Sequence, residues 1–232
     1  MLSNDDRAKI EAAVRAAELR TSGEVYCVVA QESGDYREIP LAWAAGAALL
    51  GPAVLLLAGV EVSVPDLIDR GWNAAQVGDV ASAAARGALM GAILLQGLLF
   101  AVVALFAAIG PVRRVLTPRR VKRRHVRQRA QELFLARNLS ATRARTGVLI
   151  YVSMAEHMAE LVADEGVSSK VDAKAWEPPM AALVAGLKRG DAGAGFAEAV
   201  GLCADILAEH APADAADNPN ELPDAVIELP RF

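Results

Sequence analysis

The sequence predicts an α/β domain into which a two-helix transmembrane hairpin is inserted. Two apolar runs without an ionisable side chain, Ile39–Val60 and Gly87–Val112, supply the hairpin. The basic segment Arg113–Arg129 follows them with nine lysines and arginines and no acid. Strand-like segments lie before the hairpin, at Glu24–Ala30, and after it, at Thr146–Val152. The α/β part is therefore divided by the apolar runs.

Composition agrees with a membrane anchor joined to one domain of ordinary size. The 232 residues are 54% hydrophobic and 22% charged, with a net charge of −4, and the apolar excess lies mainly between residues 39 and 112. Cys27 and Cys203 are the two cysteines. They are far apart and form no CxxC pair, which excludes a disulfide framework and a thiolate zinc site.

The first 38 residues predict a helix, a strand and a polar loop. Ser3 provides a capping hydroxyl, and the acids that follow it suit the positive end of a helix over 4–19. The same acids are unlike a secretory signal, so the first insertion signal is the apolar run. After the break at Thr21–Gly23, the β-branched and aromatic residues of Glu24–Ala30 predict a buried strand.

Each apolar run is long enough to cross a bilayer. Ile39–Val60 would span about 33 Å as a helix, against about 30 Å of hydrocarbon. The alternative is a buried core helix, which the occurrence of two such runs disfavours. The hairpin thus comprises helices at about 39–60 and 87–112, with a mildly acidic external loop over 61–86.

The basic segment predicts the orientation of the hairpin. Under the positive-inside rule Arg113–Arg129 stays in the cytoplasm, so two crossings leave both termini cytoplasmic and place the loop outside a bacterial inner (plasma) membrane. The lipid bilayer is then the first expected partner. Nucleic acid is the alternative partner for such a basic cluster, but a stop signal beside a membrane helix explains it, and no nucleic acid is expected.

The remaining chain predicts alternating helices and strands. Thr117-Pro118 is typical of a helix start, and the apolar stripe of the helix that follows ends near Asn138. Thr146–Val152 and His157–Ala163 predict two strands joined as a hairpin around 153–156. Further stripes predict a helix from Asp172 to Gly190 and another from Asp191 to about His210. The expected domain is 1–38 with 113–210, and 211–232 is an extended C-terminal tail.

Few residues suggest chemistry. The three histidines, His125, His157 and His210, lie on three separate elements, and no sequence signature of a nucleophilic or zinc hydrolase is present. Oxygen ligands for Ca²⁺ or Mg²⁺ are offered by acids near the end of a predicted strand. These candidate metal ligands are Asp164, Glu165 and Asp172. Alternatively, the same acids solvate a turn and cap a helix, which their irregular spacing favours.

The order of these elements resembles the TPM domain, a small α/β sandwich of thylakoid-lumen phosphatase-like proteins and bacterial membrane-associated proteins. Thr146-Gly147-Val148-Leu149-Ile150 is similar to the family's Gly-x-Leu strand, and Asp164-Glu165-Gly166 follows the next strand. The resemblance implies a membrane-associated bacterial member whose TPM domain is interrupted by the hairpin. The preceding loop, Ala141–Thr146, differs from the Asp- and Asn-rich loop of relatives because it carries Arg143 and Arg145.

A TPM-like fold without a catalytic signature favours a non-enzymatic role. We expect a membrane-anchored cytosolic domain that binds an unknown membrane or cytosolic protein partner, as an assembly or maintenance factor. The alternative implied by the resemblance is a divalent-metal-dependent phosphatase-like hydrolase.

Overall fold

The computed structural model describes residues 2–59, 77–139, 142, 145–213 and 223–231. The chain forms two compact units. The first consists of residues 1–35 and 119–232, and the second of residues 36–118.

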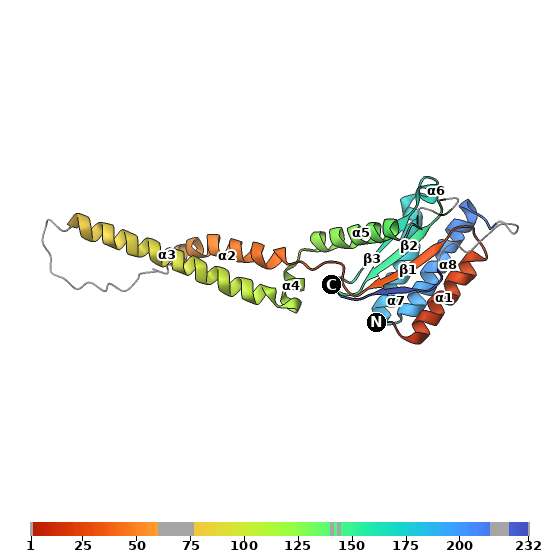
Figure 1. Cartoon of the computed structure of the whole chain (residues 1–232), viewed down its shortest axis with the longest axis horizontal. Helices are drawn as coiled ribbons and strands as arrows, with labels where there is room; N and C mark the ends of the chain where they lie inside the picture. The colour runs from red at the N-terminus through yellow and green to blue at the C-terminus, as the bar shows by residue number, and fades with distance from the viewer. Residues whose placement is uncertain (1, 60–76, 140–141, 143–144, 214–222, 232) are drawn as a thin grey trace. The chain divides into compact units, whose positions relative to one another are not determined.

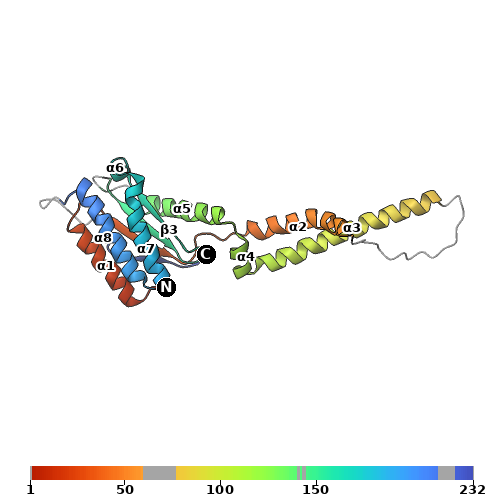
Figure 2. The ribbon, with the colours of Figure 1, turned by 180° about the vertical axis from the view of Figure 1, so that it is seen from behind.

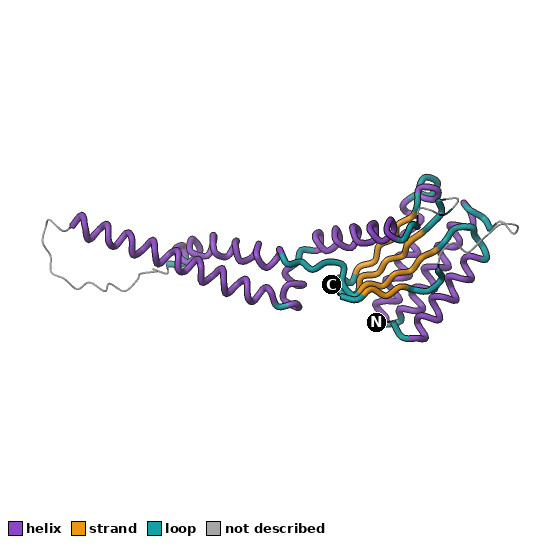
Figure 3. The backbone as a smooth tube through the Cα atoms, in the orientation of Figure 1, coloured by secondary structure: helices purple, strands orange, loops and turns teal. Residues whose placement is uncertain are grey.

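The first unit is built on a four-stranded mixed sheet in the order β3-β2-β1-β4, drawn as neighbouring orange strands in Figure 3. β1 (Val25–Ala30) runs parallel to β2 (Val148–Ser153) and β4 (Ile227–Leu229), whereas β3 (Met158–Ala163) is antiparallel to β2. The predicted mixed α/β fold and the hairpin of β2 and β3 are thus confirmed. β4 was not foreseen, since only an extended tail was expected there.

Three helices cover one face of the sheet: α1 (Asn4–Glu18), α7 (Glu177–Arg189) and α8 (Ala192–His210). All three lie in front of the strands in Figure 2. Alternate residues of the parallel strands point to this layer, as the two-residue period of a strand requires. The buried core between the layers includes Val25, Cys27, Val29, Val148, Ile150, Ile10, Leu183, Phe196 and Leu207.

The helix α5 (Arg119–Ala136) covers the opposite face, as Figure 1 shows. It buries Val126, Ala130, Leu133 and Phe134, the predicted stripe. The partners are the other alternate residues of the parallel strands, including Tyr26, Val28, Leu149 and Tyr151. The fold is therefore a helix–sheet–helix sandwich, with its two cores on the two faces of one sheet.

The helix ends follow the residues that the sequence offers. Ser3 and Asp6 form a reciprocal capping box at the start of α1, and Asp191 caps α8 through the Ala194 amide. Gly190 ends α7 with a φ of 79°, which favours glycine. Thr117 is an exception, because its hydroxyl donates back to the Arg113 carbonyl at 2.7 Å instead of capping the following helix.

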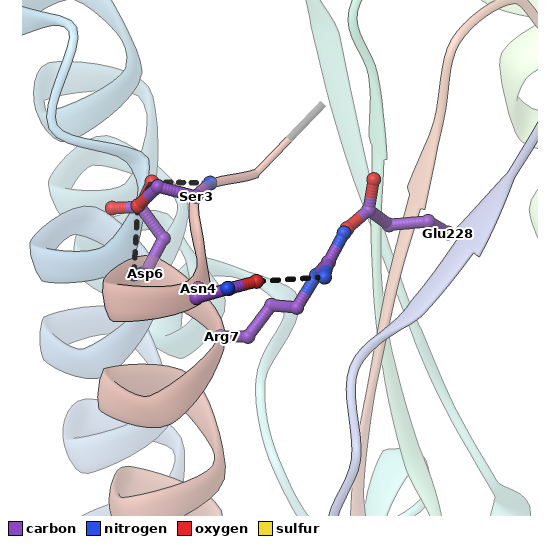
Figure 4. Close-up of polar contacts among 5 residues, drawn as sticks. All are labelled: Ser3, Asn4, Asp6, Arg7 and Glu228. Carbon is purple, nitrogen blue, oxygen red and sulfur yellow. Dashed lines mark hydrogen bonds and ion pairs between the residues drawn. The ribbon is translucent and has the colours of Figure 1, made fainter.

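The tail is fastened to the first unit by ion pairs from α1. Arg7 Nε lies 2.6 Å from Glu228 Oε1 on β4, and Arg15 Nε lies 2.9 Å from Asp224 Oδ2. Figure 4 shows Arg7 between Asn4 and Glu228, with the capping box beside it. Residues 223–231 thus belong to the folded unit, and 227–229 form the strand β4 of its sheet.

The second unit contains α2 (Glu38–Leu57), α3 (Val77–Ala108) and the short α4 (Gly110–Leu116). α2 and α3 contain two windows, Glu38–Leu55 and Leu89–Ala108, that are long and apolar enough to cross a membrane and are almost entirely unburied. The second helix was expected over 87–112 but begins ten residues earlier and ends at Ala108. Residues 77–86 of the expected loop are therefore helical, and its earlier part lies outside the described residues.

Candidate functional site

The predicted metal-ligating acids lie where β3 ends, and each has a local structural role. Asp164 is 5% exposed and caps the short helix α6 (Glu165–Ser168), accepting from the Glu165 amide at 2.7 Å. Asp172 caps a 3₁₀ turn, Ala173–Trp176, by accepting from the Lys174 amide at 2.8 Å. Among the described residues, no three His, Cys, Asp or Glu side chains gather as metal ligands do.

Arg145 is the cation that Asp164 and Glu165 share. Its guanidinium lies 2.7 Å from Glu165 Oε2 and 3.4 Å from Asp164 Oδ1. Its backbone is in the left-handed region, with a φ of 54°, a conformation that is costly for a residue with a side chain. A divalent ion bound here would have to displace this arginine, so the residues as arranged do not fit such an ion.

One oxygen of this group is distinctive. Asp164 Oδ2 is buried and makes no hydrogen bond within the described part of the chain. An orphaned buried carboxylate oxygen costs free energy, and such oxygens often mark a site that another group completes. The metal site at Asp164, Glu165 and Asp172 therefore stays a prediction.

A second polar group lies at the carboxyl ends of β1 and β2 and was not predicted. Tyr151 and Ser153 come from β2, Ser33 from the segment after β1, and Glu156 from the turn between β2 and β3. All four are buried, with Glu156 at 7% exposure and Ser153 at 0%. We call them the hydroxyl–carboxylate cluster. The cluster thus lies at the carboxyl ends of parallel strands, where open α/β sheets bind ligands.

The hydrogen bonds of the cluster run in one direction. The Ser33 hydroxyl donates to Ser153 Oγ at 2.6 Å, and the Ser153 hydroxyl donates to the Glu156 carboxylate. Because Ser33 has one hydroxyl proton, Tyr151 must donate to Ser33 Oγ across 2.8 Å. The Ser33 amide also donates to both Glu156 oxygens, at 3.3 and 3.4 Å. The chain of donors thus ends on a carboxylate.

The cluster is built to hold the chain in place. Burial raises the pKa of Tyr151, with the Ser33 hydrogen bond and the charge of Arg129 opposing the rise, so the phenol stays a neutral donor. The Glu156 carboxylate accepts a hydrogen bond from the Ser153 hydroxyl, as a general base does from a serine nucleophile. Ser153 is fully buried, however, so a substrate could not reach its hydroxyl. The role of the cluster is therefore structural: its hydrogen bonds hold residues 31–33 against the turn after β2.

A third polar group lies near the amino end of β1. Glu18 ends α1, Glu24 precedes β1 and is 4% exposed, and Asp224 belongs to the tail. Burial and the carboxylates of Glu24 and Asp224 raise the pKa of Glu18 to about 8, while Arg15 partly offsets this. Such a carboxyl holds its proton near neutral pH. Sequence reasoning missed it because the three acids are brought together by the tail.

The histidines form no site. His125 bonds through Nδ1 to the Val121 carbonyl within α5, at 3.0 Å. His157 occupies the turn between β2 and β3, and His210 ends α8. Their separation on three elements, as expected from the sequence, leaves no described pair that could share a metal or a proton.

Comparisons with known proteins agree with this architecture. A family model described as the TPM domain matches residues 104–206, from within α3 to within α8. Among solved structures, the chain is similar to the BA42 protein of the psychrophilic bacterium Bizionia argentinensis, with a TM-score of 0.54 and 15% identity. That alignment covers 98% of this chain and 95% of BA42. No curated protein matches the sequence. The resemblance to the TPM-domain family is therefore confirmed.

Proposed function

We propose that this TPM-domain protein is a membrane-anchored adaptor, whose α/β unit binds a membrane or cytosolic protein partner on the cytoplasmic side of the inner membrane. In this proposal α2 and α3 cross the bilayer, with both termini cytoplasmic. The role is one of assembly or maintenance and involves no turnover of substrate.

The observation that carries the proposal is the pairing of β1 with β2 across the hairpin. β1 precedes the two apolar helices and β2 follows them, yet their residues pair in parallel from Val25↔Val148 to Ala30↔Ser153. Two strands that pair in one sheet must lie on the same side of a membrane, even when membrane-spanning helices come between them in the sequence. A membrane-anchored form of this chain would therefore cross the bilayer an even number of times between β1 and β2, and the two candidate spans agree with this number.

The basic residues after α3 support a cytoplasmic domain. Arg113 and Arg114 lie in α4, and α5 continues the basic segment from Arg119. An excess of cations within about 15–20 residues of a span is retained in the cytoplasm. Since β1 and β2 pair in one sheet, the same argument supports a cytoplasmic position for the whole α/β unit.

Binding is favoured over catalysis by the state of the polar groups. The hydroxyl–carboxylate cluster is closed and satisfied internally, and Arg145 already holds Asp164 and Glu165. A reactive site needs groups that are reachable by substrate and geometrically poised. The described residues instead form a sheet whose two faces are both packed against helices.

A divalent-metal-dependent phosphatase-like hydrolase is the second candidate, and the buried Asp164 Oδ2 is the observation that favours it. Ca²⁺ or Mg²⁺ would be its cofactor. Phosphatase assays of the detergent-purified protein with each ion separate the two candidates. Turnover that requires metal and is lost in Asp164→Asn, but retained in the exposed control Asp205→Asn, would contradict the adaptor proposal.

Sidedness is tested with reporters that are active only outside the cytoplasm. We expect activity from a fusion inserted at Ala74 and none from a fusion after Phe232. Activity at both positions, or at Phe232 alone, would contradict an even number of crossings from the cytoplasmic side.

Partner binding is tested by photo-crosslinking in living cells. Leu19 and Leu135 are large apolar side chains of the α/β unit that are 82% and 68% exposed. A photoreactive residue at either position should give a discrete protein adduct identifiable by mass spectrometry. The adaptor proposal fails if neither position, nor polar exposed positions on each remaining helix, yields a protein adduct.

A further inference from the structure

The exposed face of α5 carries a regular row of arginines. Arg120, Arg123, Arg124 and Arg127 follow the spacing i, i+3, i+4, i+7, which places them on one side of the helix over two turns. All four are exposed, because the buried stripe of α5 faces the sheet on another side. We call this row the arginine strip.

The strip is electrostatically unfavourable in isolation. Its spacing creates like-charge neighbours at three and four residues, each of which destabilises a helix. Within the described residues, one acid faces the strip: Glu160 on β3, whose carboxylate lies 3.8 Å from Arg127 and also attracts Arg123. Four arginines thus share one carboxylate. The nearest acid on α5, Glu132, pairs instead with Arg129 at 3.3 Å. An anionic partner would reduce the remaining repulsion between the arginines of the strip.

The chemistry of the strip favours phosphate. Arginine binds phosphate oxygens through two parallel N–H donors, with a geometry that lysine lacks. All four members of the strip are arginines. The segment Arg113–Gln131 contains no Phe, Tyr or Trp, so it lacks the large stacking platforms that single-stranded nucleic acids use.

The chain itself brings the strip near a bilayer. In the second unit, Trp43 Nε1 on α2 donates to the Leu116 carbonyl at the end of α4, at 3.2 Å. Trp43 is 51% exposed, and tryptophan is enriched at the membrane–water interface. α5 begins at Arg119, three residues after Leu116, a reach of about 10 Å at most. The start of the strip is therefore tethered close to headgroup level.

We propose that the arginine strip binds the phosphates of anionic phospholipid headgroups, so that α5 is a lipid-recognition surface. This inference rests on the proposed membrane anchoring and adds a lipid class to it. Each arginine near an anionic surface should contribute roughly fivefold to the ratio of bound to free strip. The binding should weaken in high salt, where the screening length falls to about 3 Å at 1 M.

The test uses the full chain reconstituted in nanodiscs of phosphatidylcholine alone, or of an equal mixture with phosphatidylglycerol. A nitroxide is attached to Gln131→Cys, an exposed position on α5 beside the strip. The native Cys27 and Cys203 are buried, and burial raises the pKa of both thiols, so they should escape labelling. The readout is collision of the nitroxide with a water-soluble nickel reagent.

We expect the nitroxide to be shielded from nickel in the anionic mixture and accessible in phosphatidylcholine. Changing all four strip arginines to glutamine should abolish the difference. A matched control with the same loss of charge changes four exposed cations elsewhere, Lys170, Lys174, Lys188 and Arg189, to glutamine and should leave it intact. The proposal would be overturned if the nitroxide were equally shielded from nickel in both lipid compositions, or if it stayed shielded after the four strip arginines were replaced.

A second nitroxide, at Leu94→Cys on α3, reports insertion separately. Leu94 is 71% exposed and lies inside the second candidate span, so an inserted helix makes the label accessible to oxygen and protected from nickel. If this label is inserted while the strip shows no lipid dependence, the lipid inference fails alone. If the Leu94 label lies in water, membrane anchoring fails as well. Tighter binding of an oligonucleotide than of anionic lipid would also overturn the inference.

Discussion

The raised pKa of Glu18 predicts that the α/β unit is destabilised as pH rises through neutrality. An acid that holds its proton more tightly when folded stabilises the folded state at low pH. Its unfolded value is near 4.5 and its folded value about 8, so the folded state binds more protons throughout that window. Stability must therefore fall as the pH rises from about 4.5 to 8. Replacing Glu18 with glutamine removes the titration and retains a hydrogen-bonding side chain.

The magnitude follows from the size of the shift. Each pKa unit corresponds to about 1.4 kcal/mol, which sets a ceiling of about 5 kcal/mol for Glu18 alone. Burial is the largest cause of the shift, and because the Glu18 side chain is only partly buried, solvent screening reduces this ceiling. We therefore expect Glu18→Gln to stabilise the unit by about 1–3 kcal/mol at pH 8 and by much less at pH 5.

Thermal unfolding in detergent, followed by tryptophan fluorescence, measures this difference. Trp176 belongs to the same buried core as Ile10 of α1 and Phe196 of α8 and therefore reports on this layer. The expected rise in Tm is about 2–4 °C per kcal/mol for a domain of this size. Glu198→Gln, an exposed carboxyl on α8, is the control and should shift Tm little at either pH. An equal gain at pH 5 and pH 8 for Glu18→Gln would refute the reasoning.

Three other substitutions test packing and polar contacts. Gly186→Ala should lower the free energy of unfolding by about 1–3 kcal/mol, because the added Cβ would lie 2.3 Å from the backbone of α8. In the control Gly201→Ala the added Cβ meets nothing within 4 Å, so this variant should raise Tm slightly in the same measurement. Glu156→Ala leaves the buried Ser33 amide and the buried Ser153 hydroxyl without their acceptor, which costs about 1–3 kcal/mol of stability each. Amide hydrogen exchange of residues 31–33 should become faster. Unchanged protection there would contradict a structural role of the cluster. Arg7→Gln removes the ion pair with Glu228, which is worth up to about 1 kcal/mol because Arg7 is 42% exposed; a carboxypeptidase should trim the tail faster, and equal trimming rates would contradict this.

Local patterns predicted most of the α/β unit. The β-branched run at β2 and the stripe from Phe196 to Leu207 on α8 each encode burial within a few neighbouring residues, so periodicity was enough. α3 was predicted too short because Asp79 and Arg86 interrupt the apolar composition without interrupting the helix. A hydropathy criterion detects the segment that suits lipid, whereas helix formation depends on propensity and neighbours.

The missed features depend on residues distant in sequence. β4 is three residues long and lies between prolines, so it has little strand signal of its own and depends on pairing with β1. The hydroxyl–carboxylate cluster joins Ser33 to Tyr151 and Glu156, which the register of β1 and β2 brings together. Ser153 at the end of the apolar run of β2 was the one available signal. The periodicity of one sequence does not determine which residues of two distant strands pair, so the cluster could not be predicted from it.

The pairing of β1 with β2 also constrains how the protein is made. Val25 emerges from the ribosome about 120 residues before its partner Val148, and distant pairings of this kind slow folding. The apolar helices α2 and α3 are synthesised in the interval, so β1 must wait unpaired, with its apolar side chains exposed, until β2 follows. Under the proposed membrane anchoring, biogenesis has a compulsory order, in which membrane insertion precedes closure of the sheet. A nascent chain stalled before residue 148 would present an unprotected strand, and we expect it to depend on chaperones that the finished protein does not need.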